Sequence, residues 1–131
     1  MKTKITNAGL AYLSGMSELR TCFVGETALT DEGLPHLKGL TKLAALDVHG
    51  TQVTGAGFDN LKALSLGHLN ASGAAIDDSG LEKLAEIGTL REVLLRGSKV
   101  TATGVAKLKE ALPNCRLDLD PEIEAALKSK K

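Results

Sequence analysis

A glycine followed by an apolar residue recurs at an almost constant interval along this chain of 131 residues. The five pairs are Gly9-Leu10, Gly33-Leu34, Gly57-Phe58, Gly80-Leu81 and Gly104-Val105, spaced 24, 24, 23 and 24 residues apart. An aliphatic residue stands four positions before each glycine, at Ile5, Leu29, Val53, Ile76 and Val100. Self-similarity at a fixed period of this length indicates a stack of similar structural units, because one unit alone buries almost no apolar surface.

The spacing of the aliphatic residues changes inside each unit. In the second unit, leucines occupy every third position from Leu34 to Leu46, and the spacing then shortens to alternation at Val48. A period near three is typical of a short helix or 3₁₀ segment, whereas alternation is typical of a strand with one buried face. Each unit is therefore expected to contain one short helix and one short strand.

The stretch from Leu43 to Val53 fits the pattern L-x-x-L-x-L-x-x-N/C-x-L at every aliphatic position. With its Thr-x-x-Gly-Leu segments, the chain resembles the leucine-rich-repeat family, in the bacterial or cysteine-containing-like variety with repeats of about 24 residues. The resemblance extends from about Ile5 to Asp120. It implies an α/β fold, namely a leucine-rich-repeat solenoid forming a short horseshoe arc, with a parallel concave sheet of about five strands and short helices on the convex side.

We expect a single leucine-rich-repeat domain over residues 1–131. Its repeats are predicted at about 5–28, 29–52, 53–75, 76–99 and 100–120, with a C-terminal capping helix at about 121–129. The positions that hold Asn or Cys in the family pattern are Thr27, Thr51, Ala74 and Ser98 in this chain. Hydroxyl hydrogen bonds to the backbone are therefore expected in every such repeat except the one with Ala74. The third repeat is also one residue short between Leu64 and Leu66, which predicts a local dent or a change in curvature.

Polar residues stand just ahead of the recurring glycine. Thr30 and Asp31 do so in the second repeat, and Asp77 and Asp78 in the fourth. Their side-chain oxygens suit a helix N-cap, where they accept hydrogen bonds from free backbone N–H groups. We expect the glycine itself to allow close packing of helix against strand.

Charge and cysteine usage narrow the function class. Lys plus Arg and Asp plus Glu number 16 each, so no net field favours nucleic acid or an anionic membrane. The sequence has no apolar run long enough to span a membrane and no apolar run behind Met1 that resembles a secretion signal. Cys22 and Cys115 match no metal or redox spacing, so we predict free thiols, a cytoplasmic location, no metal and no cofactor.

Binding residues are expected on the strands, because side chains between the core positions of a strand point away from the core. The family pattern places these candidates on the concave face: Phe23, Asp47, His49, His68, Asn70, Glu92, Leu94, Arg96, Arg116 and Asp118. Phe23 and Leu94 are apolar where a solvated strand prefers polar residues, so each is a candidate anchor for a partner. The alternative is that both are isolated exposed apolar residues without a role.

The resemblance implies a non-catalytic protein-protein interaction scaffold or adaptor that binds another protein or peptide through the concave sheet. One alternative is a structural or oligomerisation subunit, a homo-oligomer formed through an N-terminal edge near Cys22 that has no capping unit ahead of it. A third interpretation is a small metal-dependent hydrolase built on Asp47, His49 and His68. That interpretation is the weakest, because the sequence pairs no nucleophile with an orienting base.

Overall fold

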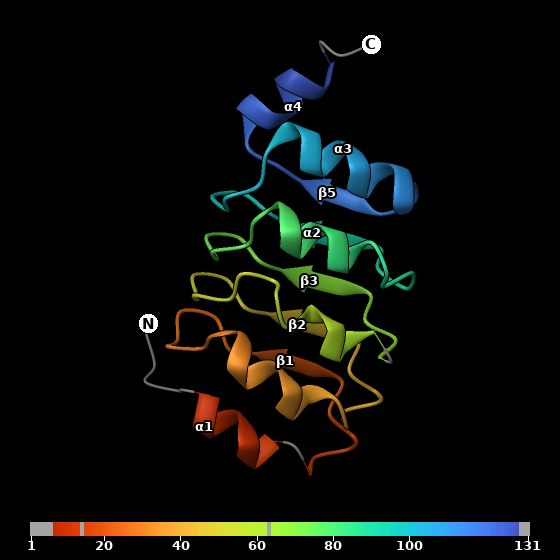
Figure 1. Ribbon diagram of the computed structural model, residues 1–131. Helices are drawn as coiled ribbons and strands as arrows, with labels where there is room; N and C mark the ends of the chain where they lie inside the picture. Colours follow the sequence, from red (N-terminus) through yellow and green to blue (C-terminus); the bar gives the residue numbers. More distant parts are fainter. Residues whose placement is uncertain (1–6, 14, 63, 129–131) are drawn as a thin grey trace.

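A parallel β-sheet of five strands forms one side of the molecule (Figure 1). The computed structural model describes residues 7–13, 15–62 and 64–128. The strands are β1 (Thr21–Phe23), β2 (Ala45–Asp47), β3 (His68–Asn70), β4 (Glu92–Leu94) and β5 (Arg116–Asp118). They pair in chain order, and every pairing is parallel. The expected α/β fold with a five-stranded parallel sheet is confirmed.

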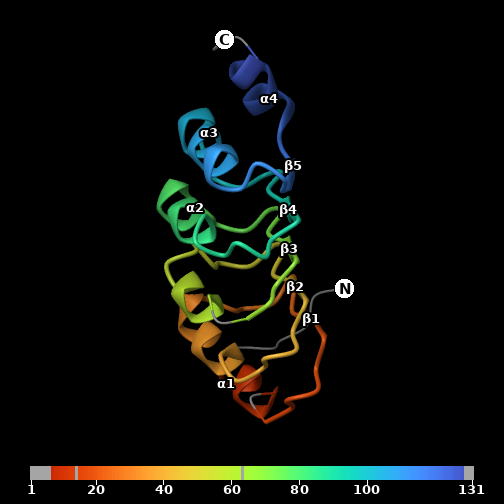
Figure 2. The ribbon, with the colours of Figure 1, turned by 90° about the vertical axis from the view of Figure 1, so that its right-hand side faces the viewer.

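Short helices cover the other side. In chain order they are α1 (Asn7–Leu10), η1 (Ala11–Leu13), η2 (Asp31–Leu37), η3 (Phe58–Leu61), α2 (Asp78–Leu84), α3 (Ala102–Ala111) and α4 (Pro121–Lys128), where η denotes 3₁₀ geometry. Figure 2 shows the strands on one side of the molecule and the helices α1, α2 and α3 on the other. Consecutive parallel strands require a crossover connection, and here each crossover carries one of these helices. The turns of the chain therefore stack in sequence order.

In β1 to β4 the central residue is buried and its two neighbours are exposed or partly exposed, whereas in β5 the central residue is partly buried. The central residues Cys22, Leu46, Leu69, Val93 and Leu117 are register partners across the sheet. Cys22 is 4% exposed and takes the place that Leu46 takes in the next repeat. Burial raises the pKa of the Cys22 thiol, which keeps it protonated and apolar in character. Both Cys22 and Cys115 are free thiols.

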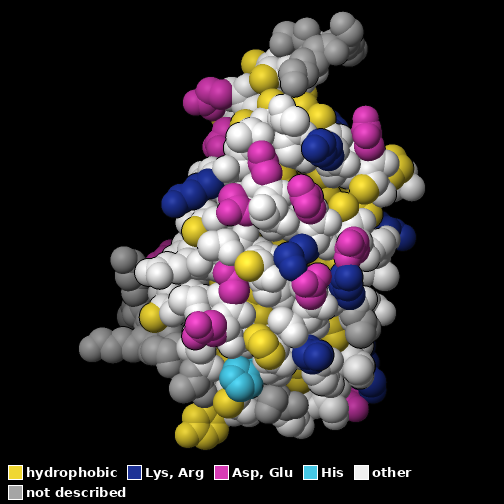
Figure 3. All heavy atoms as spheres, in the orientation of Figure 1, with side chains coloured by type: hydrophobic (Ala, Val, Ile, Leu, Met, Phe, Trp, Pro, Cys, Tyr) yellow, Lys and Arg dark blue, Asp and Glu magenta, His cyan; other side chains and the backbone are white. Residues whose placement is uncertain are grey.

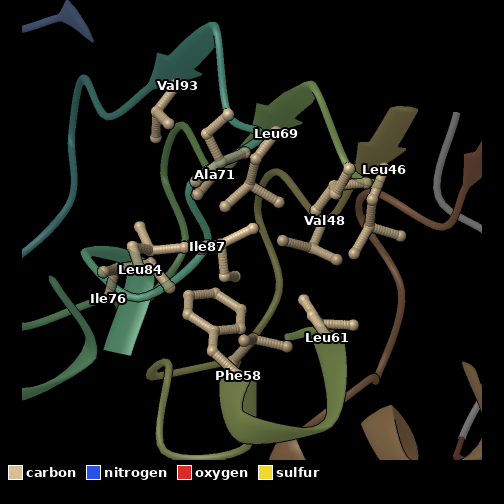
Figure 4. Packing of buried hydrophobic residues seen from close by; sticks show 14 of the residues in the cluster. Leu46, Val48, Phe58, Leu61, Leu69, Ala71, Ile76, Leu84, Ile87 and Val93 are labelled. Carbon is tan, nitrogen blue, oxygen red and sulfur yellow. The ribbon is translucent and has the colours of Figure 1, made fainter. Parts of the chain in front are cut away.

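The shortened third repeat keeps its place in the sheet. The missing residue is taken from the connection between η3 and β3, and β3 pairs with both neighbours in register. Ala71 is fully buried at a position where the neighbouring repeats have the larger residues Val48 and Leu95. The same repeat contributes Phe58, the largest of the fully buried side chains, at the position of Leu34 in the second repeat. Figure 4 shows the Phe58 ring pointing from η3 into the core, toward Ile87.

Hydroxyl groups bond to the backbone where the family pattern has Asn or Cys. The Oγ1 atoms of Thr27 and Thr51 donate to the carbonyl oxygen three residues earlier at 2.7 Å, and Ser98 Oγ does so at 2.6 Å. Ala74 has only its backbone N–H, which donates to the Ala71 carbonyl at 3.1 Å. The expected loss of one side-chain bond at Ala74 is thus confirmed.

The predicted helix caps divide into two kinds of contact. Thr30 and Asp77 are N-caps, whose side chains accept from the backbone N–H groups of Glu32 and Gly80. Asp31 and Asp78 are not caps. Each carboxylate crosses to the following repeat and accepts hydrogen bonds from its backbone and from a threonine hydroxyl. Both residues therefore link two successive repeats.

The recurring glycine has a different role from the one expected. A Cβ atom at Gly80 would lie 2.4 Å from the Thr54 carbonyl oxygen of the preceding turn. At Gly104 it would lie 2.2 Å from the Asp78 carboxylate. At Gly80 the neighbouring atom is backbone, so the glycine is needed for this turn to pack against the previous one, whereas at Gly104 the Asp78 carboxylate would have to move. The expectation of helix-against-strand packing was wrong.

The C-terminal helix predicted at about 121–129 is present as α4. Its residues Ile123 and Leu127 are partly buried against the core, so they cover the end of the stack. Among the described residues, no helix is long and apolar enough to span a membrane.

Candidate functional site

The side of the sheet that faces away from the helices carries the side chains that alternate with the buried strand positions. We call this surface the sheet face. Strand register arranges it in a first row, Thr21, Ala45, His68, Glu92 and Arg116, and a second row, Phe23, Asp47, Asn70, Leu94 and Asp118. Two residues beyond the second row follow Gly25, His49, Ser72, Arg96 and Asp120. All ten candidate binding residues fall in these three sets, and their role in binding stays a prediction.

Ion pairs link neighbouring strands across this face. Glu92 Oε2 accepts from Arg116 Nη1 at 2.7 Å, and Glu92 Oε1 lies 3.4 Å from His68 Nδ1. At the β5 end, Arg96 Nε donates to Asp118 Oδ1 at 2.9 Å. These side chains are partly exposed to solvent, which screens the pairs, so they contribute little to folding. They mainly fix where the charged groups lie on the sheet face.

His49 is held between two carboxylates from neighbouring repeats. Its Nδ1 lies 2.6 Å from Asp47 Oδ1, and its Nε2 lies 3.3 Å from Glu26 Oε2. The hydrogen bond with Asp47 raises the pKa of His49, while partial burial opposes the shift and Glu26 adds to it. In the folded chain, His49 therefore stays protonated up to a higher pH than it does in the unfolded chain.

Two features around His49 were missed by sequence reasoning. Gly25 leaves room for the imidazole, because a Cβ atom there would lie 2.2 Å from His49 Nδ1. Glu26 has a φ of 56°, in the left-handed region where the equivalent positions are glycines such as Gly50 and Gly73. The only sequence signal was this break in the glycine pattern, since a non-glycine residue in that conformation is uncommon and costs free energy.

The residues proposed for a hydrolytic or metal site do not assemble as such a site requires. Asp47 contacts His49, and Asn70 Nδ2 approaches Asp47 Oδ2 at 3.4 Å, but His68 pairs with Glu92 instead. Within residues 7–13, 15–62 and 64–128, no group of three or more His, Cys, Asp or Glu side chains is placed to hold a metal ion.

A shallow depression of about 290 Å³ lies in the sheet face over β2, β3 and β4. Its lining includes Leu46 and Leu69, whose side chains are buried on the opposite side of the sheet, and Phe23 and Leu94 stand at opposite ends of it. Phe23 is 74% exposed, which is unusual for a large apolar side chain. The depression exists because the side chains between these two ends are short.

The helix side has a different character. Figure 3 shows acidic and basic side chains interspersed over the helices. Several pair between repeats, such as Lys83 with Asp59 at 2.5 Å and Lys42 with Glu18 at 2.8 Å. A mixed surface of this kind is typical of a solvated face.

Comparisons with known proteins were made on the sequence and on the structure. No protein-family model matches the chain, and no curated protein matches its sequence. Among solved structures, the chain is similar to an internalin from Listeria monocytogenes, with a TM-score of 0.51 and 17% sequence identity.

The match covers 83% of this chain and 36% of the internalin chain, so the protein spans about a third of that structure. At this identity the likeness concerns the fold alone. Internalin is a leucine-rich-repeat protein, and the five-stranded parallel sheet with short helices fits that class.

Proposed function

We propose that this chain is a short leucine-rich-repeat solenoid that acts as a non-catalytic scaffold or adaptor and binds a protein or peptide through its sheet face. The observation that carries the proposal is the sheet face itself. It presents a row of different side chains on a regular backbone, with exposed Phe23 at one end of a depression. Repeat folds use such extended surfaces for recognition, because the core is independent of what the outward positions contain.

A protein partner suits this surface better than nucleic acid. The chain has no net charge, and four carboxylates face two guanidinium groups across the three sets of sheet-face residues. Nucleic acid binding depends on neutralising phosphates with Lys and Arg, which this face does not offer in excess. The bacterial-type or cysteine-containing-like subclass and a cytoplasmic location remain predictions from the sequence.

Affinity capture with three forms of the chain tests the proposal. The wild type is compared with a sheet-face variant carrying Phe23→Ser, His49→Ala and Arg96→Glu. A control with the same loss of two positive charge units carries Lys38→Glu on the exposed helix side. We expect one or more proteins to be retained by the wild type and the control and lost by the folded sheet-face variant. Identical captures by all three forms would place binding elsewhere and refute the proposed face.

A second candidate function is self-association through the N-terminal edge. The three exposed large apolar residues described in the structure are Tyr12, Met16 and Phe23, at 87%, 49% and 74% exposure, and all lie before or within edge strand β1. An edge strand offers unpaired backbone groups to another chain. Light scattering after size-exclusion chromatography decides between the two functions. A monomer at all concentrations removes this candidate, whereas a dimer that Tyr12→Ser and Met16→Ser dissociate would support it.

A further inference from the structure

The depression in the sheet face combines an apolar surface with negative charge. Its outward apolar side chains are Phe23 and Leu94, which bound it along the second row, and Ala45 in the first row. Asp47, Glu92 and His68 also line it, whereas no Lys or Arg of the described chain does so. A hollow with apolar walls strengthens the field of the charges on its rim, because the low-dielectric wall screens them less than water does.

Each of the two carboxylates keeps one oxygen atom that is poorly satisfied. Among the described residues, Asp47 Oδ1 accepts from His49 N at 2.9 Å and contacts the ring at 2.6 Å, but Oδ2 has only Asn70 at 3.4 Å. Within the same part of the chain, Glu92 Oε2 accepts from Arg116, but Oε1 has only His68 at 3.4 Å. Contacts of 3.4 Å are long for charged hydrogen bonds, which are usually near 2.8 Å. Both oxygens therefore retain capacity for a further donor.

Phe23 lies beside one of these carboxylates. Phe23 and Asp47 are register partners on adjacent strands, so their side chains project from backbones about 5 Å apart. A cation above the face of an aromatic ring is attracted by its quadrupole, and here the same cation would also reach a carboxylate. Phe23 and Asp47 together can therefore bind one positively charged group that has an apolar stem.

We propose that this depression receives an arginine side chain of the partner protein. The guanidinium stacks on Phe23 and donates to Asp47 Oδ2, while the aliphatic stem lies in the depression between Phe23 and Leu94. Glu92, on β4 and about 10 Å from β2, adds negative potential from the far side. Arginine fits better than lysine because its planar, weakly hydrated group both stacks on a ring and donates to a carboxylate. The site rests on the binding role proposed for the sheet face, and it specifies which type of side chain the partner inserts.

The test is an NMR titration of the isotope-labelled full chain with the capped tripeptide acetyl-Gly-Arg-Gly-amide. The matched control peptide replaces arginine with citrulline, which keeps the shape and removes the charge. A third peptide carries lysine. We expect the arginine peptide to shift the amide signals of Phe23, Asp47, Asn70 and Leu94 at millimolar concentration. The lysine peptide should bind more weakly, and citrulline should leave these signals unchanged.

Two variants with the same charge change sharpen the result. Asp47→Asn removes a carboxylate that lines the depression, whereas Asp59→Asn removes one from the helix side of the molecule. We expect Asp47→Asn to weaken arginine binding by about threefold to tenfold, and Asp59→Asn to change it by less than about twofold. The dispersed amide spectrum of each variant shows that it remains folded.

Three outcomes would overturn the arginine site. They are equal shifts with citrulline, shifts that map away from the depression, and the absence of shifts at tens of millimolar peptide. Equal weakening by Asp47→Asn and Asp59→Asn would also overturn it, since only general charge would then matter. The affinity capture described above reports separately on the proposed function. A partner that depends on the sheet face, together with no arginine binding, would keep the scaffold and remove only this site.

Discussion

Replacement of Asp31 tests how successive repeats are held together. Its carboxylate accepts from Thr54 N at 2.9 Å, Thr54 Oγ1 at 2.7 Å, Gly55 N at 3.0 Å and Gly57 N at 3.0 Å. Asp31→Ala therefore leaves three backbone N–H groups of the third repeat without their acceptor. Gly55 is buried, so water replaces that bond poorly.

The expected loss follows from these bonds. Each backbone N–H that loses a charged acceptor costs about 1 kcal/mol where the site is partly exposed, so Asp31→Ala should lower the free energy of unfolding by about 3 kcal/mol. Asp78 offers an internal control, because among the described residues its carboxylate accepts only from Thr101, through N at 2.8 Å and Oγ1 at 2.5 Å. With one backbone N–H in place of three, Asp78→Ala should cost about a third as much.

Urea unfolding followed by circular dichroism measures both losses, first near neutral pH and then in acid. Burial raises the pKa of Asp31, but the hydrogen bonds from Thr54, Gly57 and Gly55 outweigh it and hold the pKa below the ordinary value of 3.8. A lowered folded pKa means that this stabilisation is present above pH 3.8 and is lost as the pH falls through the folded value. The gap between wild type and Asp31→Ala should therefore narrow in acid.

Two results would refute this reasoning. A loss at Asp31 no larger than the loss at Asp78 would show that the number of hydrogen bonds does not set the stability of the contact between repeats. A gap that stays constant through acid pH would show that the charge of the carboxylate is unimportant.

Further predictions concern the core, the glycine contacts and the sheet face. Leu46→Ala, at a fully buried strand position, should cost about 2–5 kcal/mol in urea unfolding, whereas its neighbour Asp47→Ala should cost less than about 1 kcal/mol; similar losses at both would contradict the strand register. Gly80→Ala should lower the free energy of unfolding by about 1–3 kcal/mol, because its Cβ would meet backbone. Gly88→Ala, with open space around it, should leave this free energy unchanged, and thermal unfolding of both variants measures the difference. The bond with Asp47 raises the folded pKa of His49 above 6.5, so its stabilisation is complete at low pH and is lost as the pH rises through the folded value. His49→Ala should thus destabilise more near pH 5 than near pH 9, and a loss independent of pH would argue against the pairing.

Much of the fold was predictable because its signals are local. The glycine period and the change in aliphatic spacing placed one helix and one strand in each repeat, and the strands lie where alternation begins. The outward positions of the strands followed from the same alternation, so all ten candidate residues were placed on one surface. The N-caps at Thr30 and Asp77 were also predictable, since a cap bonds to a backbone group two or three residues away.

Contacts between turns could not be predicted in the same way. Thr30 and Asp31 are adjacent acceptors at the start of a helix. Nothing in the sequence shows that Thr30 caps this helix while Asp31 bonds to the next repeat. The choice depends on where Thr54, 23 residues later, lies once the next turn has stacked. The recurring glycine was misassigned for the same reason, because its close contact is with the preceding turn.

The sequence by itself determined the repeat, the order of helices and strands, and the division of strand residues into buried and exposed. These properties depend on periods of two to four residues and on the repeat length, which are visible in any single unit. The tertiary structure alone decided that His49 lies between Asp47 and Glu26. It also decided that short side chains between Phe23 and Leu94 leave a depression, where two carboxylate oxygens each have only a long contact within the described residues. Such features arise from the superposition of residues about one repeat apart, so they exist only after the turns have stacked.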